Sequence, residues 1–259
     1  MSESSHAGRV AVVGSERAVP LDARRTGEPN PATRTTVTIV LRAQTSSARA
    51  AASLAPLAAA HREYLTREAF AVEHGATAQD ALEVQRFAVD AGLLVLETNL
   101  ARRSVVVEGT LAALSAAFGT ELHLYQTGNG QFRGRVGELW IPRSLDGIVT
   151  GVFGLDERPQ ARAQFRRAVR PAATADVSYA PTTVAAAYQF PKSSTGAGQT
   201  VALIELGGGY VQADLNTYFA GRGGAAPSVT SVAVDGASTA AGGDSNADTE
   251  VMLDIEVVG

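Results

Sequence analysis

Two carboxylates, Glu250 and Asp254, stand four residues apart near the end of the sequence, in a stretch whose hydrophobic residues follow a helical period. In a helix, their side chains would lie one turn apart in the middle of an apolar stripe. Because burying unpaired charge is costly, this placement favours a pair that shares one proton and takes part in acid–base chemistry. The alternative is an ordinary amphipathic helix whose acidic side chains reach solvent.

A third carboxylate, Glu205, lies near the end of a nearly continuous apolar segment, residues 200–206. Such a segment is typical of a strand buried on both faces of a parallel sheet. Open α/β sheets place their functional sites at the carboxyl ends of their strands. Glu205 could therefore share a proton with Glu250, or it could point into water at the strand end, and the sequence leaves both interpretations open.

Three glycines, Gly207 to Gly209, follow this segment directly and could suggest a dinucleotide-binding turn. The sixth position of the G-x-G-x-x-G pattern is Gln212 instead of glycine. The glycines therefore favour a tight turn, and the departure argues against a nucleotide-binding α/β fragment.

The elements that must position these residues alternate between helix and strand. Residues 179–259 are expected to contain, in order, a short helix from Pro181, a strand at 200–206, a helix at 211–221, a strand at 228–234 and the acidic helix. This order is the beginning of a doubly wound α/β domain with a parallel sheet. Such a sheet needs several more strands to be complete.

Residues 35–156 have a different organisation. Alternating apolar and polar residues predict strands at 35–41, 93–96, 104–107, 121–125, 131–133 and 139–142. Capping and stop signals predict helices that end at Gly75, begin at Thr77 and lie between Gly109 and Gly119. The hairpin turns among them imply an α+β fold with helices on one face of an antiparallel sheet. The histidines of this region, at 61, 74 and 123, are too scattered to predict a metal site.

Segments without periodicity flank and join these two regions. Residues 1–34 are rich in Ser, Arg, Gly and Pro and are predicted to be a flexible leader. Residues 157–178 are predicted to be a basic, cleavable linker. Five arginines between positions 158 and 170, with no acidic residue among them, precede a Pro/Ala-rich run there.

Composition and charge exclude several classes of protein. With 45% hydrophobic residues, 19% charged residues and no cysteine, the chain is expected to be globular, without disulfides. No apolar run approaches the roughly 18 residues of a membrane helix, so no membrane partner is expected, and the first residues show no signal peptide. The net charge of −4 divides into +3 for residues 1–170 and −7 for residues 171–259. The two parts could attract each other, and nucleic acid is not expected as a partner.

An ordered set of motifs resembles the sedolisins, the serine-carboxyl peptidases. Residues 66–70, 74–75, 117–119 and 152–156 resemble the activation domain of that family, whereas residues 178–181, 188–191, 204–210 and 250–256 resemble the beginning of its catalytic domain. The resemblance implies an α+β antiparallel prodomain, like a subtilisin propeptide, at 35–156. It also implies the N-terminal part of a subtilisin-like α/β parallel-sheet domain at 179–259.

The resemblance also implies a role for each carboxylate. Glu250 would be the general base toward a serine nucleophile, Asp254 the second acid of a Ser-Glu-Asp triad, and Glu205 an extension of the hydrogen-bond network behind Glu250. The prodomain would be an intramolecular chaperone and inhibitor of its own catalytic domain, cut away in acid. The mature protein would be an extracellular endopeptidase acting on proteins or peptides.

In that family, the nucleophilic serine, an oxyanion-hole aspartate and a calcium site all lie downstream of the position matched by Gly259. The 259-residue chain is therefore expected to be inactive by itself and to hold no calcium ligands, whereas Ca²⁺ is expected in the full-length protein. Two other interpretations stay open. One is a stand-alone prodomain-like module that inhibits or chaperones a protease in trans, and the other is a gene remnant.

Overall fold

The computed structural model describes residues 7–19, 21–56, 61, 63–128, 130–158, 179–191, 196–234 and 237–259. The chain divides into two compact units, residues 1–158 and 159–259, and each is described by itself. Most of the predicted linker, residues 159–178, lies outside the described residues.

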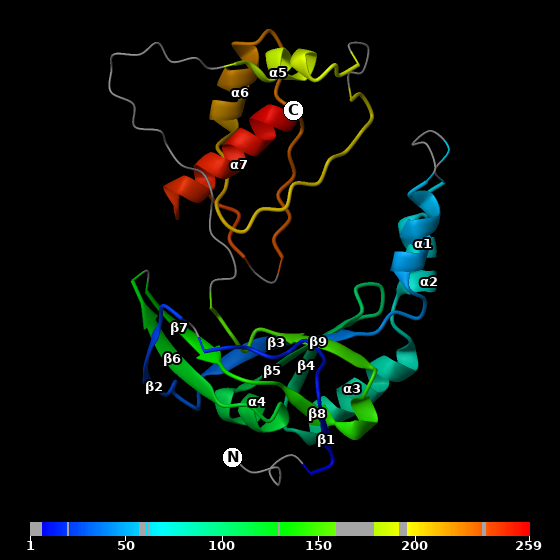
Figure 1. The fold of residues 1–259 in the computed structure, drawn as a ribbon, viewed down its shortest axis with the longest axis vertical. Coiled ribbons are helices and arrows are strands. Elements are labelled where there is room, and N and C mark those ends of the chain that lie inside the picture. The colour runs from blue at the N-terminus through cyan, green and yellow to red at the C-terminus, as the bar shows by residue number, and fades with distance from the viewer. Residues whose placement is uncertain are drawn as a thin grey trace. The chain divides into compact units, whose positions relative to one another are not determined.

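The first unit is built on an antiparallel sheet with the strand order β4-β5-β3-β9 (Figure 1). Its strands are β3 (Arg34–Leu41), β4 (Leu94–Asn99), β5 (Ser104–Thr110) and β9 (Val149–Phe153). Ile39 in β3 is paired with Val105 on one side and Val152 on the other. The alternation of β3 buries Val37, Ile39 and Leu41, as the sequence pattern predicts for a strand with one covered face.

Threonines precede three of the four α-helices described in this unit. The helices are α1 (Ser47–Leu54), α2 (Arg67–His74), α3 (Ala78–Asp90) and α4 (Leu111–Ala117). The side chains of Thr66, Thr77 and Thr110 each accept a hydrogen bond from the backbone N–H three residues on, which satisfies a donor that the helix itself cannot pair. The predicted stop at Gly75 is confirmed, because α2 ends at His74 with Gly75 as its C-cap, where a Cβ would collide with the carbonyl oxygen of Ala71.

The order of these elements, β3-α3-β4-β5-α4-β9, is a β-α-β-β-α-β arrangement. A second group of strands is inserted before β9, namely β6 (Leu122–Thr127), β7 (Gly130–Arg135) and β8 (Trp140–Pro142), followed by a short 3₁₀ turn, Arg143–Leu145. Both α3 and α4 pack against the sheet on the same side, as Figure 1 shows. The predicted α+β fold with helices on one face of an antiparallel sheet is confirmed.

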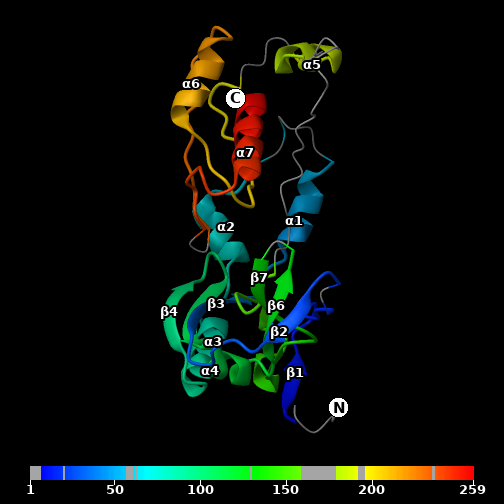
Figure 2. The ribbon, with the colours of Figure 1, turned by 90° about the vertical axis from the view of Figure 1, so that its left-hand side faces the viewer.

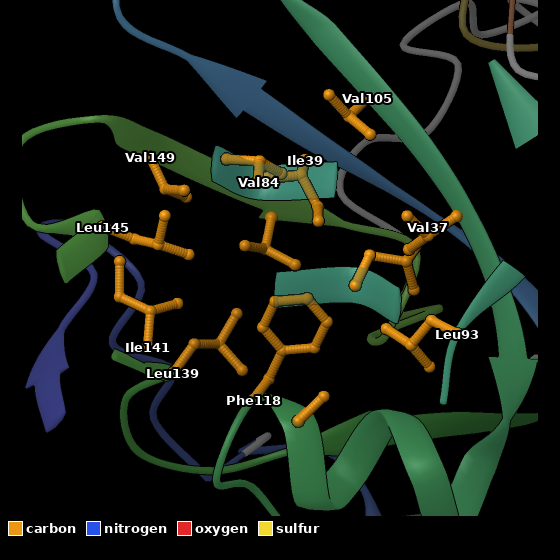
Figure 3. Close-up of a cluster of buried hydrophobic side chains, with 14 of the residues drawn as sticks. Val37, Ile39, Val84, Leu93, Val105, Phe118, Leu139, Ile141, Leu145 and Val149 are labelled. Atoms are coloured by element: carbon orange, nitrogen blue, oxygen red, sulfur yellow. The ribbon is translucent and has the colours of Figure 1, made fainter. Parts of the chain in front are cut away.

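The core of the first unit lies between the sheet and these helices, where Phe118 is fully buried (Figure 3). Its ring meets the ring of Phe87 edge-on, with 5.8 Å between the ring centroids. The same core is closed by Leu139 just before β8, Ile141 in β8 and Leu145 in the turn after it. The inserted segment therefore contributes side chains to the hydrophobic core of the unit.

The predicted flexible leader at 1–34 is wrong for its described residues. Within it, β1 (Arg9–Ala11) pairs with β8 (Figure 1), and β2 (Arg24–Gly27) pairs with β6 (Figure 2). Val12 is buried in the core of the unit. These short, polar edge strands carry no hydrophobic period of their own. Their order depends on partner strands about a hundred residues away, which a local pattern cannot reveal.

An ion pair ties the loop after β3 to the start of α3, and it carries a testable prediction. Both carboxylate oxygens of Asp80 accept hydrogen bonds from Arg42, at 2.8 and 2.9 Å, and the Asp80 side chain is only 5% exposed. These hydrogen bonds from Arg42 lower the pKa of Asp80 below its ordinary value of 3.8. The pair should therefore stabilise the fold above that value, and its contribution should vanish as the pH falls through the lowered pKa.

We expect Asp80→Asn to cost about 1 kcal/mol at neutral pH, the low end for such bonds because half of Arg42 is exposed. Chemical unfolding of wild type and variant at neutral and acid pH measures the difference. A matched control is Glu108→Gln, whose carboxylate pairs with exposed Arg34 on the surface and should matter less. An Asp80→Asn cost that persists unchanged in strong acid would contradict the ion-pair explanation.

The second unit contains three described helices, α5 (Pro181–Ala187), α6 (Gln212–Ala220) and α7 (Ser245–Val258). Helices α6 and α7 pack together through Leu215, Phe219, Val251 and Ile255, and they lie side by side in Figures 1 and 2. The helices predicted from Pro181, at 211–221 and at the acidic end are all present.

The predicted strands at 200–206 and 228–234 are not formed in this structure. Ile204 and Leu206, expected in the middle of a sheet, are 88% and 79% exposed. A parallel strand requires neighbouring strands and helices over both faces, and the described residues from 179 onward contain no strand to pair with. The subtilisin-like parallel sheet therefore remains a prediction.

Candidate acid–base site

Helix α7 carries two of the predicted site residues and is fixed at both its start and its inner face. At its start, the Asp244 side chain caps the helix by accepting hydrogen bonds from the backbone N–H groups of Asn246 (2.8 Å) and Ala247 (3.3 Å). Along the inner face, Val251 and Ile255 are buried against α6. This packing sets the rotation of α7 and leaves Glu250 and Asp254 half-buried, as expected for carboxylates beside an apolar stripe.

Glu205 joins this pair although its segment does not form a strand. Burial raises the pKa of the Glu205 carboxyl, and the negative charge of Asp254, a hydrogen bond with Asp254 and the charge of Glu250 raise it further. Two carboxyl groups can share a hydrogen bond only when one of them holds a proton, and the raised pKa of Glu205 favours its protonated form. Its other oxygen, Oε1, is buried without a hydrogen-bond partner. The structure thus brings together the three carboxylates that the sequence singles out.

The raised pKa of Glu205 makes the stability of the second unit depend on pH in a defined direction. The folded unit holds a proton on Glu205 at pH values where the unfolded chain, with an ordinary value near 4.5, has lost it. Stability should be greatest below 4.5 and fall as the pH rises through the folded-state pKa. Above that pKa, the cost of the buried charge persists.

We expect Glu205→Gln to reduce this pH dependence, because the amide keeps the volume of the carboxylic acid and never ionises. Hydrogen exchange of the α7 amides, measured on both sides of pH 4.5, tests it. Wild type should exchange faster at the higher pH after correction for intrinsic rates, and the variant should show a smaller increase, the remainder coming from Glu256, whose pKa burial also raises. If the corrected exchange rates of the α7 amides changed equally with pH in both proteins, Glu205 would not be the source of the pH dependence.

The glycine turn after Glu205 is a tight turn, as predicted. Gly207 and Gly208 adopt positive φ angles of 146° and 78°. A Cβ on Gly208 would lie 2.5 Å from the carbonyl carbon of Ala247, in the first turn of α7. Only glycine permits this approach of two backbones.

One residue that sequence reasoning missed connects this turn to α7. Asp248 projects away from Glu250 and Asp254, and its carboxylate accepts hydrogen bonds from the backbone N–H groups of Gly209 and Gly242. Its signal in the sequence is weak, since an aspartate in the first turn of a helix is common for reasons of helix polarity alone.

Glu256, in the last turn of α7, lies outside the carboxylate cluster. Burial raises its pKa, the positive charge of Arg222 opposes this, and the negative charge of Asp214 adds to it. Glu256 therefore shares the helix and the residue type of Glu250 but faces different neighbours. This makes it a matched control for the site.

Two histidines of the first unit, His74 and His123, are buried, whereas His61 is exposed. His74 is buried and its Nδ1 lies 2.8 Å from the carbonyl oxygen of Thr45, while the Nδ1 of His123 lies 2.9 Å from a carboxylate oxygen of Glu28. Among the described residues, no three His, Cys, Asp or Glu side chains come together to hold a metal ion. No described helix is long and apolar enough to cross a membrane.

Comparison with known proteins assigns the family. Residues 22–158 match the activation domain of pro-kumamolisin, which extends the predicted domain start at 35 back to include β2. Kumamolisin from Bacillus sp. (strain MN-32) is 44% identical to this chain over 240 residues, which are 87% of this chain and 43% of kumamolisin. The chain belongs to the kumamolisin-like sedolisins, and it spans less than half the length of this relative.

Proposed function

We propose that this chain is the N-terminal part of the precursor of an acid-acting serine-carboxyl endopeptidase. The observation that carries the proposal is the convergence of Glu205, Glu250 and Asp254 in the unit that follows a pro-kumamolisin activation domain. Carboxylates that share a proton can accept a further proton only weakly, which suits chemistry at acid pH.

In the proposed mechanism, a serine hydroxyl supplied by the longer protein attacks the carbonyl carbon of a peptide. Glu250 accepts the hydroxyl proton as the bond forms, and later returns a proton to the leaving amine. Asp254 lies next to Glu250 on α7 and shares a hydrogen bond with Glu205, which supports Asp254 from behind.

The first unit offers a surface for the proposed inhibition of its own catalytic domain. The helices cover one face of the β4-β5-β3-β9 sheet, and the register places Val40, Val106, Leu94 and Phe153 on the other face. Leu94 and Phe153 are 54% and 56% exposed. An apolar sheet face of this kind fits a protein partner. Cleavage within residues 157–178 would then separate the two parts.

Three further features belong to the longer protein in this proposal. The mature enzyme would act outside the cell on protein or peptide substrates. It would bind Ca²⁺ through residues beyond those of this chain, and no step above goes through that ion. The 259-residue chain would have no peptidase activity, because proton acceptors without a nucleophile cannot form an acyl-enzyme.

A second candidate, a prodomain-like inhibitor or chaperone that acts in trans, is favoured by the complete hydrophobic core of the first unit. The test that separates the two uses the full-length protein from the same reading frame. An enzyme should hydrolyse a denatured protein substrate with an acid optimum and carry a reactive serine. A product that never hydrolyses protein, yet slows a related peptidase, would support the inhibitor instead.

A further inference from the structure

Asp248 joins three segments of the second unit through one carboxylate. Its Oδ1 accepts a hydrogen bond from the backbone N–H of Gly209 at 2.8 Å, and its Oδ2 accepts one from the backbone N–H of Gly242 at 2.7 Å. Gly209 belongs to the turn that follows Glu205, and Gly242 belongs to the loop that leads into α7. Asp248 itself lies in the first turn of α7.

The segments that Asp248 joins are in backbone-to-backbone contact. A Cβ on Gly208 would approach the carbonyl carbon of Ala247 to 2.5 Å, and one on Gly209 would approach the carbonyl oxygen of Thr239 to the same distance. The hydrogen bond from Gly209 to Asp248 therefore attaches the turn to α7, and the one from Gly242 holds the preceding loop on the same carboxylate.

This attachment bears on the carboxylate cluster because of where its ends lie. Gly209 is four residues from Glu205, and Asp248 is on the same rigid helix as Glu250 and Asp254. We propose that Asp248 is a positioning residue, which holds the Glu205 segment against α7 so that Glu205 meets Asp254. Asp248 does not belong to the cluster itself, and the inference rests on the proposed function only for its effect on catalysis.

The chemistry of the attachment requires a carboxylate. An ionised aspartate offers an acceptor to each of the two N–H groups. Asparagine can accept from only one, because its NH₂ group would face the other donor. Asp248→Asn should therefore loosen the attachment of the turn to α7 nearly as much as Asp248→Ala does, although asparagine preserves the shape of the side chain.

The test follows the Glu205 carboxyl by ¹³C NMR during an acid titration of the 259-residue chain. In wild type, Glu205 should titrate above its ordinary value of 4.5, because of burial and its neighbours. In Asp248→Ala and Asp248→Asn, its midpoint should fall toward 4.5, because Glu205 moves away from Asp254 and into water. The charges that raise the pKa of Glu205 are those of Asp254 and Glu250, so loss of the Asp248 charge is not the cause.

Asp244→Ala is the matched control. Asp244 also accepts two backbone N–H bonds at the start of α7, but both come from the helix itself and neither comes from the glycine turn. It should weaken the helix start and leave the Glu205 midpoint unchanged. A Glu205 midpoint unaffected by either Asp248 variant would overturn the proposal. An equal fall in Asp244→Ala would also overturn it, because the effect would then come from the helix start.

The full-length protein separates this inference from the proposed function. If it is a peptidase, Asp248→Asn should lower kcat at least tenfold, leave KM nearly unchanged and shift the pH profile, whereas Asp244→Ala should do none of these. Unchanged kcat and pH profile in Asp248→Asn would contradict the positioning role. If the full-length protein has no peptidase activity, the proposed function fails, and the NMR titration alone decides the role of Asp248.

Discussion

In the full-length protein, Glu250→Gln is expected to lower kcat/KM for a protein substrate at acid pH by about 10²- to 10⁴-fold or more, the range that general-base catalysis contributes. Glutamine keeps the size of the side chain but cannot take the proton of an attacking hydroxyl. The substitution should act on kcat, because the proton transfer belongs to the transition state and not to substrate binding.

Glu256→Gln provides the matched control for this prediction. It removes a carboxylate whose pKa is also raised by burial, from the same helix, but outside the cluster. We expect it to leave kcat within a few-fold of wild type. Equal losses in the two variants would show that the acidity of α7 matters only for folding, and would remove Glu250 from the proposed mechanism.

The second large effect concerns stability. Phe118→Ala should destabilise the first unit by about 3–5 kcal/mol, because it opens a cavity in a fully buried position beside Phe87. The single tryptophan of the chain, Trp140, lies in β8, so its fluorescence reports the unfolding of this unit. Urea unfolding of the whole chain should show a large fall in the midpoint with little change in slope.

Phe153→Ala is the control for size and residue type. The Phe153 side chain is 56% exposed on the uncovered face of the sheet, so its loss should change the free energy of unfolding by only about 0.5 kcal/mol. If both variants were equally unstable, Phe153 would have to be covered by a partner surface in solution.

The sequence predicted best those elements whose signals are local. Thr77 and Gly75 mark helix boundaries through their own side-chain and backbone geometry, and both were confirmed. Strand β3 shows an alternation that burial reproduces. By contrast, β1 and β2 form because distant strands pair with them. Strand β9 was not predicted, because its five residues, Val149–Phe153, show no distinct alternation.

The residues of the candidate site also differ in whether a local signal or a distant contact places them. The four-residue spacing of Glu250 and Asp254 on a helix is a local property, and α7 confirms it. Glu205 was identified from a strand that does not form here, yet it lies in the cluster because the glycine turn packs on α7. Asp248 could not be identified from the sequence, because its hydrogen bonds go to backbone groups of two separate loops.

The central claim is that Glu250 and Asp254 perform acid–base catalysis in a precursor that removes its own activation domain. The most direct measurement is the fate of the full-length precursor in acid, followed by mass spectrometry of new N-termini. The account predicts that wild type is cut within residues 157–178 at acid pH and stays intact at neutral pH, while Asp254→Asn stays intact at both. An Asp254→Asn precursor that still cuts itself there in acid would contradict the account.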